Sequence, residues 1–212
     1  MFQAEYQYVR AIGEDLYTGP QDVRNFRADR ANLSGLRRQL LTVNYLYDLP
    51  FGKGRPFLNQ SGAVDWIIGG WQVGGITTAG TGTPFSPSFT STIQGSPNGR
   101  PNVVSDWHVS DRGITRWFNA AAFAVPAPFT YGNSGKNVMT GPGLVNFDLS
   151  IYKNFSFADR LRLQFRSEFF NIANHANFAN PAANITVPAQ VGRITSTSTA
   201  NRVIQFGLRL TF

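Results

Sequence analysis

Apolar and polar residues alternate along the last eleven residues of the chain, Arg202 to Phe212. Successive side chains of a β-strand point to opposite faces, so this alternation predicts a strand with one wholly apolar face. That face carries Ile204, Phe206, Leu208, Leu210 and Phe212. A strand of about ten residues with one apolar and one polar face is typical of transmembrane barrels, which meet lipid outside and water inside.

The same two-residue period predicts five further strands. They lie near residues 2–9, 39–49, 67–79, 146–157 and 160–170. In the strand near 146–157, Lys153 falls on the apolar side close to the strand end, where we expect its ammonium group to reach lipid head groups. The predicted fold class is therefore all-β, an antiparallel transmembrane β-barrel.

Charged residues fall on the opposite faces of these strands. The lumen-facing candidates are Asp148, Arg162, Arg166, Glu168 and Arg209. Burying such groups in a dry protein core is costly without pairing, whereas the interior of a water-filled barrel keeps them hydrated. Two interpretations stay open for them: contact with a ligand, or structural pairing with neighbouring strands or a plug.

The connections alternate in length. Long irregular loops are predicted at 10–36, 81–143 and 171–201, whereas about 17 residues follow the second strand and a tight turn lies near Ala158 and Asp159. If the C-terminus is periplasmic, the three long connections are extracellular, as in outer-membrane barrels. Aromatic residues of the longest loops could grip a sugar or peptide ligand, or pack the loop on itself. They include Trp107, Trp117, Phe123 and Tyr131.

Composition excludes several classes of function. The net charge is +7, but Lys and Arg are scattered, which argues against a nucleic-acid partner. There is no cysteine, and neither His108 nor His175 belongs to a metal-binding motif, so we expect no disulfide, metal or cofactor. No spacing suggests a catalytic triad or a nucleophile elbow, so we expect no enzyme.

The strand count and the N-terminus predict a fragment of a longer chain. The first residues, Met1 to Tyr8, have no basic region followed by an apolar stretch, so the export signal is expected upstream. Single-chain membrane barrels have at least about eight strands, so six predicted strands are too few to close one.

Several segments carry a resemblance to a known family. They are Tyr47–Arg55, Gly69–Ile76, Gly80–Phe85, Gly99–Val104, Trp117–Phe123, Gly141–Ser150, Arg166–His175 and the terminal strand. Together they resemble the C-terminal barrel region of TonB-dependent outer-membrane transporters, specifically the Oar-like group common in acidobacteria, which has an N-terminal carboxypeptidase-regulatory-like domain.

The resemblance implies a barrel of about 22 strands, of which this chain would form the last six. It implies a plug domain, energy supplied by the inner-membrane TonB complex, and a scarce ligand too large for porins. It also implies outer-membrane lipid as a partner, and assembly machinery that reads the closing strand ending in Phe212. The fragment alone would not transport, and the ligand is not specified.

Two other interpretations remain open. One is a soluble or surface-exposed β-sandwich module that binds carbohydrate or another partner, although sandwiches need two mutually buried sheets. The other is an independent small porin, which the strand count and the missing signal disfavour.

Overall fold

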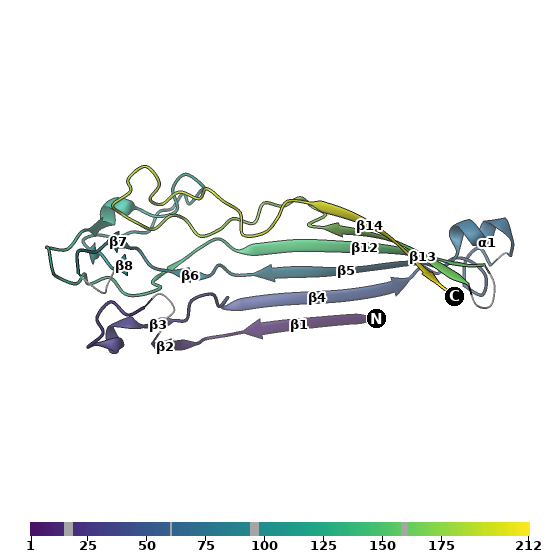
Figure 1. The fold of residues 1–212 in the computed structure, drawn as a ribbon, viewed down its shortest axis with the longest axis horizontal. Coiled ribbons are helices and arrows are strands. Elements are labelled where there is room, and N and C mark those ends of the chain that lie inside the picture. The colour runs from purple at the N-terminus through teal and green to yellow at the C-terminus, as the bar shows by residue number, and fades with distance from the viewer. Residues whose placement is uncertain (15–18, 60, 94–97, 158–160) are drawn as a thin grey trace.

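The computed structural model describes residues 1–14, 19–59, 61–93, 98–157 and 161–212. Within these residues, six strands form one antiparallel sheet in the order β1, β4, β5, β12, β13, β14, which we call the main sheet. Its strands run along the long axis of an elongated molecule, with the loops gathered at one end and the C-terminus at the other (Figure 1). The strands are β1 (Phe2–Tyr8), β4 (Gln39–Asp48), β5 (Trp71–Gly80), β12 (Leu144–Ser156), β13 (Arg162–Phe170) and β14 (Val203–Thr211).

The pairing register carries the apolar face from strand to strand. Leu149 of β12 lies opposite Phe169 of β13, which lies opposite Ile204 of β14. On the other side of β12, Ile151 lies opposite Val73 of β5. Because residues that pair across a sheet share a face, the main sheet has one continuous apolar face, which includes the residues predicted for the closing strand.

The polar face is continuous in the same way. Ser150 of β12 pairs with Glu168 of β13, which pairs with Gln205 of β14. At the far edge, Gln3 of β1 pairs with Asn44 of β4. The alternation read from the sequence therefore separates the two faces of the sheet in three dimensions.

No part of the described chain covers most of the apolar face. Tyr6, Phe206 and Leu208 are 62%, 66% and 72% exposed. An apolar surface that extends over several strands is far larger than the patches that soluble monomers leave in water. The face therefore requires a covering that these residues do not supply.

The buried core lies in the loops instead of against the sheet. Phe85, Phe118, Ala122, Phe123 and Met139 form a buried cluster. Half-buried residues from both long C-terminal loops pack against it, namely Val103, Trp107, Trp117, Ala120, Ala183, Ile185 and Val191. We call this assembly of residues 81–143 and 171–201 the loop unit.

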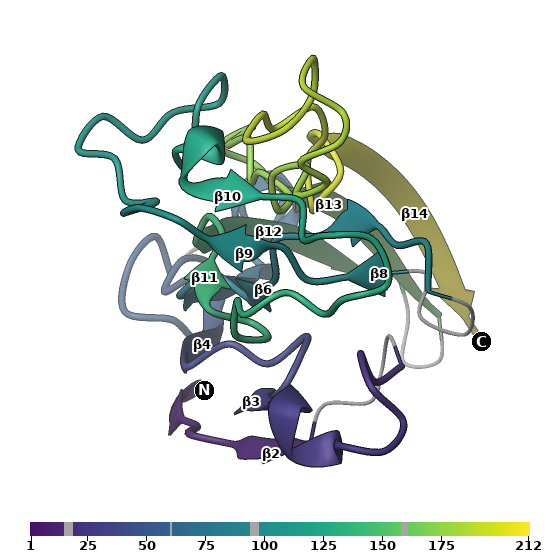
Figure 2. The ribbon, with the colours of Figure 1, turned by 90° about the vertical axis from the view of Figure 1, so that its left-hand side faces the viewer.

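The prediction that residues 10–36 and 81–143 are wholly irregular is wrong. The first contains β2 (Ile12–Glu14), η1 (Phe26–Asp29) and β3 (Arg30–Asn32). The second contains β6 (Pro84–Phe85), β7 (Phe89–Thr90), β8 (Asn98–Gly99), β9 (Asn102–Val103), η2 (Ala120–Ala122), β10 (Phe123–Ala124) and β11 (Met139–Thr140). The pairs β2 with β3, β6 with β11, β7 with β8 and β9 with β10 fold these loops over the end of the sheet (Figure 2). Strands of two or three residues are too short for a two-residue period to show in sequence.

The third predicted strand also begins later than expected. Residues 67 and 68 belong to a helix, α1 (Ala63–Ile68), and β5 begins at Trp71. Gly62 and Gly70 flank the helix with φ of 93° and 68°, values that favour glycine. A short apolar run such as Trp66 to Ile68 fits either a helix or a strand, so periodicity alone could not place this boundary.

Lys153 does not reach lipid head groups. It is 3% exposed, because the segment between β4 and β5 folds over it. Its Nζ donates a hydrogen bond to the carbonyl of Gly69 and lies 5.6 Å from the ring centre of Trp71 and 4.9 Å from that of Phe155. The expectation of an exposed ammonium group was therefore wrong.

The predicted tight turn at Ala158 and Asp159 lies outside the described residues. Among the residues that are described, no helix has the length and hydrophobicity needed to cross a membrane.

The uncovered face makes a testable prediction. Leu208→Arg should destabilise the protein in a bilayer by up to about 2–4 kcal/mol, because it places a charge on the apolar face of β14. The matched control is Gln205→Arg, on the polar face of the same strand, which should have little effect. The measurement is the free energy of folding into lipid vesicles, for the full-length protein. Equal losses of folding free energy in Leu208→Arg and Gln205→Arg would contradict the assignment of these two side chains to opposite faces of the sheet.

Candidate functional site

The predicted lumen residues lie together on the polar face of the main sheet, but only some of them contact one another. Arg166 Nε is 3.5 Å from Glu168 Oε1, an ion pair along one strand. The side chain of Arg166 is 45% exposed and that of Glu168 is 19% exposed. Arg209 pairs in register with Gln164, and Arg162 with Thr211. The polar face therefore carries charged side chains, two of which form an ion pair.

The carboxylate of Asp148 accepts hydrogen bonds from two nearby asparagine residues. Its Oδ1 accepts hydrogen bonds from Asn146 Nδ2 at 2.9 Å and from the backbone N–H of Asn171 at 2.8 Å. Asn171 directly follows β13 and has a φ of 50°, so Asp148 stabilises the chain reversal at the end of that strand. This carboxylate fixes the start of the last loop.

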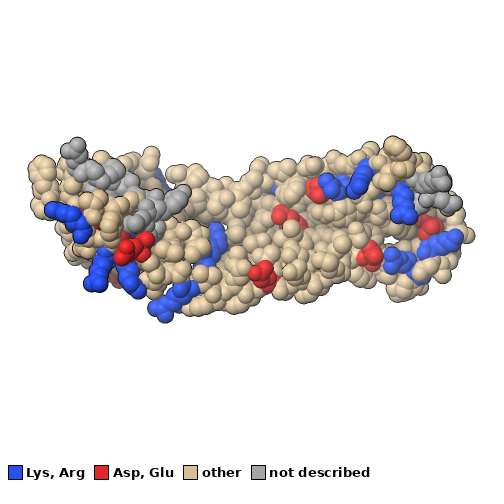
Figure 3. Space-filling model, turned by 60° about the horizontal axis from the view of Figure 1, so that its bottom comes forward, with Lys and Arg blue, Asp and Glu red and all other residues tan. Residues whose placement is uncertain are grey.

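In the space-filling view, Lys and Arg side chains gather toward the two ends of the molecule, and only scattered charges lie between them (Figure 3). On this face, the end that carries the loops is therefore one of two basic regions.

The aromatic residues predicted to contact ligand mostly pack the loop unit on itself. Phe123 is 6% exposed, and its ring stacks on Trp107 at 5.8 Å. Trp117 is half-buried and donates from Nε1 to the carbonyl of Thr140 at 2.9 Å. Tyr131 is 37% exposed. Of these four residues, Phe123 is core and Tyr131 has the most accessible ring.

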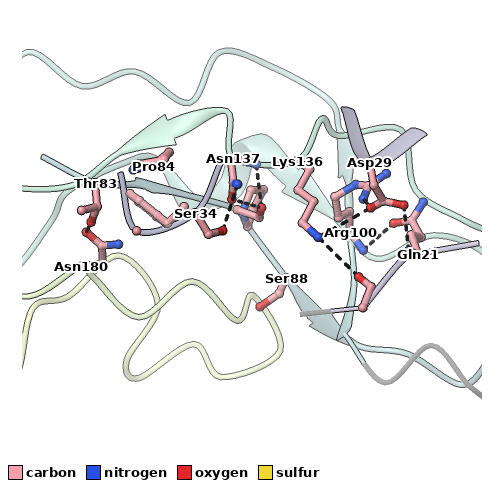
Figure 4. Close-up of a pocket in the computed structure, with 15 residues that line it drawn as sticks. Gln21, Asp29, Ser34, Thr83, Pro84, Ser88, Arg100, Lys136, Asn137 and Asn180 are labelled. Atoms are coloured by element: carbon pink, nitrogen blue, oxygen red, sulfur yellow. Dashed lines mark hydrogen bonds and ion pairs between the residues drawn. The ribbon is translucent and has the colours of Figure 1, made fainter. Parts of the chain in front are cut away.

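A cavity of about 410 Å³ lies where residues 19–35, 83–88, 100, 136–137 and 180 meet. Asp29, Arg100 and Gln21 lie at one end of it, and Thr83 and Asn180 at the other (Figure 4). Its walls combine hydroxyl and amide groups with the apolar side chains of Pro84 and Phe85. The cavity therefore joins the first loop to the loop unit.

A buried ionic cluster closes one end of the cavity. Asp29 is fully buried, and its carboxylate pairs with the Arg100 guanidinium. Arg100 also donates from Nη2 to the Ala28 carbonyl at 2.9 Å and from Nε to the Ser134 carbonyl at 2.9 Å. Lys136 Nζ lies 4.0 Å from Asp29 Oδ1. One carboxylate thus faces two cations, so these three side chains carry a net charge of +1 within the cavity wall.

Gln21 completes this cluster from the other side. Its backbone N–H donates to Asp29 Oδ2 at 3.1 Å, and its Oε1 accepts from the Arg100 backbone N–H at 2.8 Å. Sequence reasoning missed the cluster, because Asp29 and Arg100 are 71 residues apart and no local pattern links them. Buried charges are retained only when paired, so the cluster fixes how the first loop meets the loop unit.

At the other end of the cavity the groups are neutral. Thr83 Oγ1 donates to Asn180 Oδ1 at 3.3 Å, and Asn137 Nδ2 donates to the Asn32 carbonyl at 2.7 Å. A concave site with a few convergent polar groups and apolar walls suits a small polar ligand, or one part of a larger one.

One exposed carboxyl group in the loops has a shifted pKa. The backbone N–H and the imidazole of His108 hold the pKa of Asp106 below its usual value. His108 Nδ1 lies 2.5 Å from Asp106 Oδ1. Within the described residues, no three His, Asp or Glu side chains gather in a way that could hold a metal ion.

Comparison with protein families decides what kind of sheet this is. A model of the outer membrane beta barrel domain matches residues 1–205, nearly the whole chain. The chain belongs to this outer-membrane barrel family. A search of curated proteins and a search of solved structures each found no match.

Membership of the outer-membrane barrel family confirms the predicted fold class and explains why the apolar face of the main sheet is uncovered. In an outer-membrane barrel domain the apolar band faces lipid and the opposite face lines the interior. The match also indicates an outer-membrane location. Within the described residues the sheet is open, with β1 and β14 at its edges, so this barrel domain needs further strands to close.

The ionic cluster gives a prediction for the loops of the barrel domain. Asp29→Asn should destabilise the packing of the first loop on the loop unit by about 3–5 kcal/mol, because it leaves two buried cations without their carboxylate. The measurement is hydrogen exchange of residues 19–35 and 98–104, which should speed up. Asp111→Asn, the same chemical change at an exposed position, is the control and should leave exchange unchanged. Unchanged exchange in Asp29→Asn would show that the pair does not hold the loops.

Proposed function

We propose that residues 1–212 form part of the wall and the extracellular loops of a TonB-dependent outer-membrane receptor, which imports a scarce or large ligand. The observation that carries this proposal is the two-faced main sheet, apolar on one side and charged on the other, with large folded loops at one end only. The wall of a porin has a two-faced sheet of the same kind, so the sheet alone does not distinguish a porin from a TonB-dependent receptor. The TonB-dependent assignment rests in addition on the motifs from Tyr47–Arg55 to Arg166–His175, whose order resembles that of the Oar-like group.

The loop end is the part of the chain best suited to first contact with a ligand. The cavity beside Asp29 and Arg100 offers hydroxyl, amide and cationic groups, and Tyr131 is an exposed aromatic residue in the adjacent loop. On the polar face, Arg162 and Arg166 would meet a ligand or a plug inside the barrel. The role is binding and passage, without chemistry on the ligand.

In this proposal, the remaining strands, the plug and the TonB-binding segment belong to parts of the protein outside residues 1–212. The barrel-assembly machinery would recognise the closing strand through its apolar residues, Ile204, Phe206, Leu208, Leu210 and Phe212. The C-terminus and the connection between β4 and β5 would be periplasmic, and the loop unit extracellular.

The test uses the complete protein, purified from outer membranes. It should be retained by an immobilised periplasmic domain of TonB, and it should give no steady ion conductance in a planar bilayer, since a plug closes the barrel. A plug-deleted version is the control and should lose retention by TonB. Steady conductance without TonB binding would identify a porin. Recovery of the protein in a soluble cell fraction would instead favour the β-sandwich module.

A further inference from the structure

The short helix α1 exposes an apolar side at the end of the main sheet opposite the loop unit. It lies just beyond the strand ends, at the same end of the molecule as the C-terminus (Figure 1). Val64, Trp66 and Ile67 are 39%, 51% and 63% exposed. Val64 and Ile67 are three residues apart, so they lie on the same side of the helix. Asp65 is the helix's single charged residue.

The other side of α1 is attached to the apolar face of the sheet. The ring of Trp66 packs on that of Phe155, with centroids 4.9 Å apart. Trp71 Nε1 donates to the Ile67 carbonyl at 2.9 Å, and Lys153 donates to the Gly69 carbonyl. By register, Trp71 and Lys153 are paired neighbours, and both lie on the apolar face. The exposed side of α1 therefore continues the lipid-facing surface and not the polar one.

The polar groups of this region are directed away from the exposed side of α1. Asp65 is half-buried, and its Oδ1 accepts a hydrogen bond from the backbone N–H of Lys53 at 2.6 Å. The ammonium group of Lys153 is enclosed. Lys53, in the turn before the helix, is exposed, whereas Arg55 pairs with Asp48 at 3.5 Å. Apolar and aromatic residues next to an exposed lysine match the boundary between acyl chains and phosphate head groups.

We propose that α1 is an interfacial anchor, lying in the head-group boundary of the periplasmic leaflet of the outer membrane. Val64, Ile67 and the exposed part of Trp66 enter the edge of the acyl region, while Lys53 faces the phosphates. The anchor holds the connection between β4 and β5 against the outside of the barrel. The proposal rests on the barrel-wall part of the proposed function and is independent of TonB coupling.

Depth-dependent fluorescence quenching tests this placement. Residues 1–212 contain no cysteine, so single-cysteine variants can carry an environment-sensitive dye, in a complete protein without other cysteines. Ile67→Cys and Val64→Cys probe the helix, and the second keeps the test valid if the first misfolds. Phe206→Cys marks the lipid-facing wall, and Ile114→Cys marks an exposed loop position. The protein is folded into phosphatidylcholine vesicles with nitroxides either at the head group or deep in the acyl chains. Iodide serves as the aqueous quencher.

The expected result is that head-group nitroxides quench the dyes at 64 and 67 several-fold more than iodide does. The dye at 206 should respond most to the deep nitroxide, and the dye at 114 to iodide. Quenching by iodide at 64 and 67 as strong as at 114 would place the helix in water and overturn the anchor. Protection of the dyes at 64 and 67 from all three quenchers would indicate that a protein partner covers the helix, and would also overturn the anchor. Loss of lipid quenching at 206 would refute the barrel wall itself, so the two failures are distinguishable.

Discussion

The fold depends on an apolar sheet face that lipid covers in place of protein. In hydrocarbon no water is present to satisfy a backbone N–H or carbonyl, and each unsatisfied group costs several kcal/mol. Long strands with antiparallel neighbours on both sides meet this constraint, and β4, β5, β12 and β13 each have two such neighbours. The edge strands β1 and β14 have one each within the described residues, so they are where a barrel must continue.

Because lipid covers the sheet, the protein's own packing is concentrated in the loops. There the surroundings are aqueous, and apolar groups are stabilised in the usual way, by burial against one another. Phe85, Phe118 and Phe123 form that core, and the Asp29 to Arg100 pair joins the first loop to it. The cavity is therefore built on a folded unit with fixed geometry. This suits selective binding better than a set of separate flexible loops.

What the sequence could predict follows from the length over which each pattern extends. Strands of seven to thirteen residues repeat a period of two several times, so all the strands of the main sheet and their two faces could be predicted. Helix α1 has six residues and the loop strands have two or three, too few for any period to show. The buried pair of Asp29 and Arg100 could not be predicted for another reason, because it joins residues that only the folded chain brings together. The candidate loop aromatics were correctly placed in the loops, but the sequence could not tell core residues such as Phe123 from exposed ones such as Tyr131.

Lys153 shows how local and tertiary requirements combine at the end of the sheet. Its position on the apolar face was evident from the alternation, and a lysine at such a site usually extends to the membrane surface. Here the segment after β4 folds back and supplies the Gly69 carbonyl, while Trp71 of β5 and Phe155 of β12 supply two aromatic rings, so the charge is satisfied within the protein. Cations are stabilised over aromatic rings, most strongly where water is excluded. The same fold-back places Trp66 on Phe155 and turns the remaining apolar side of α1 outward. The enclosed lysine and the exposed apolar side of α1 therefore have one cause, which is the fold-back of the segment between β4 and β5.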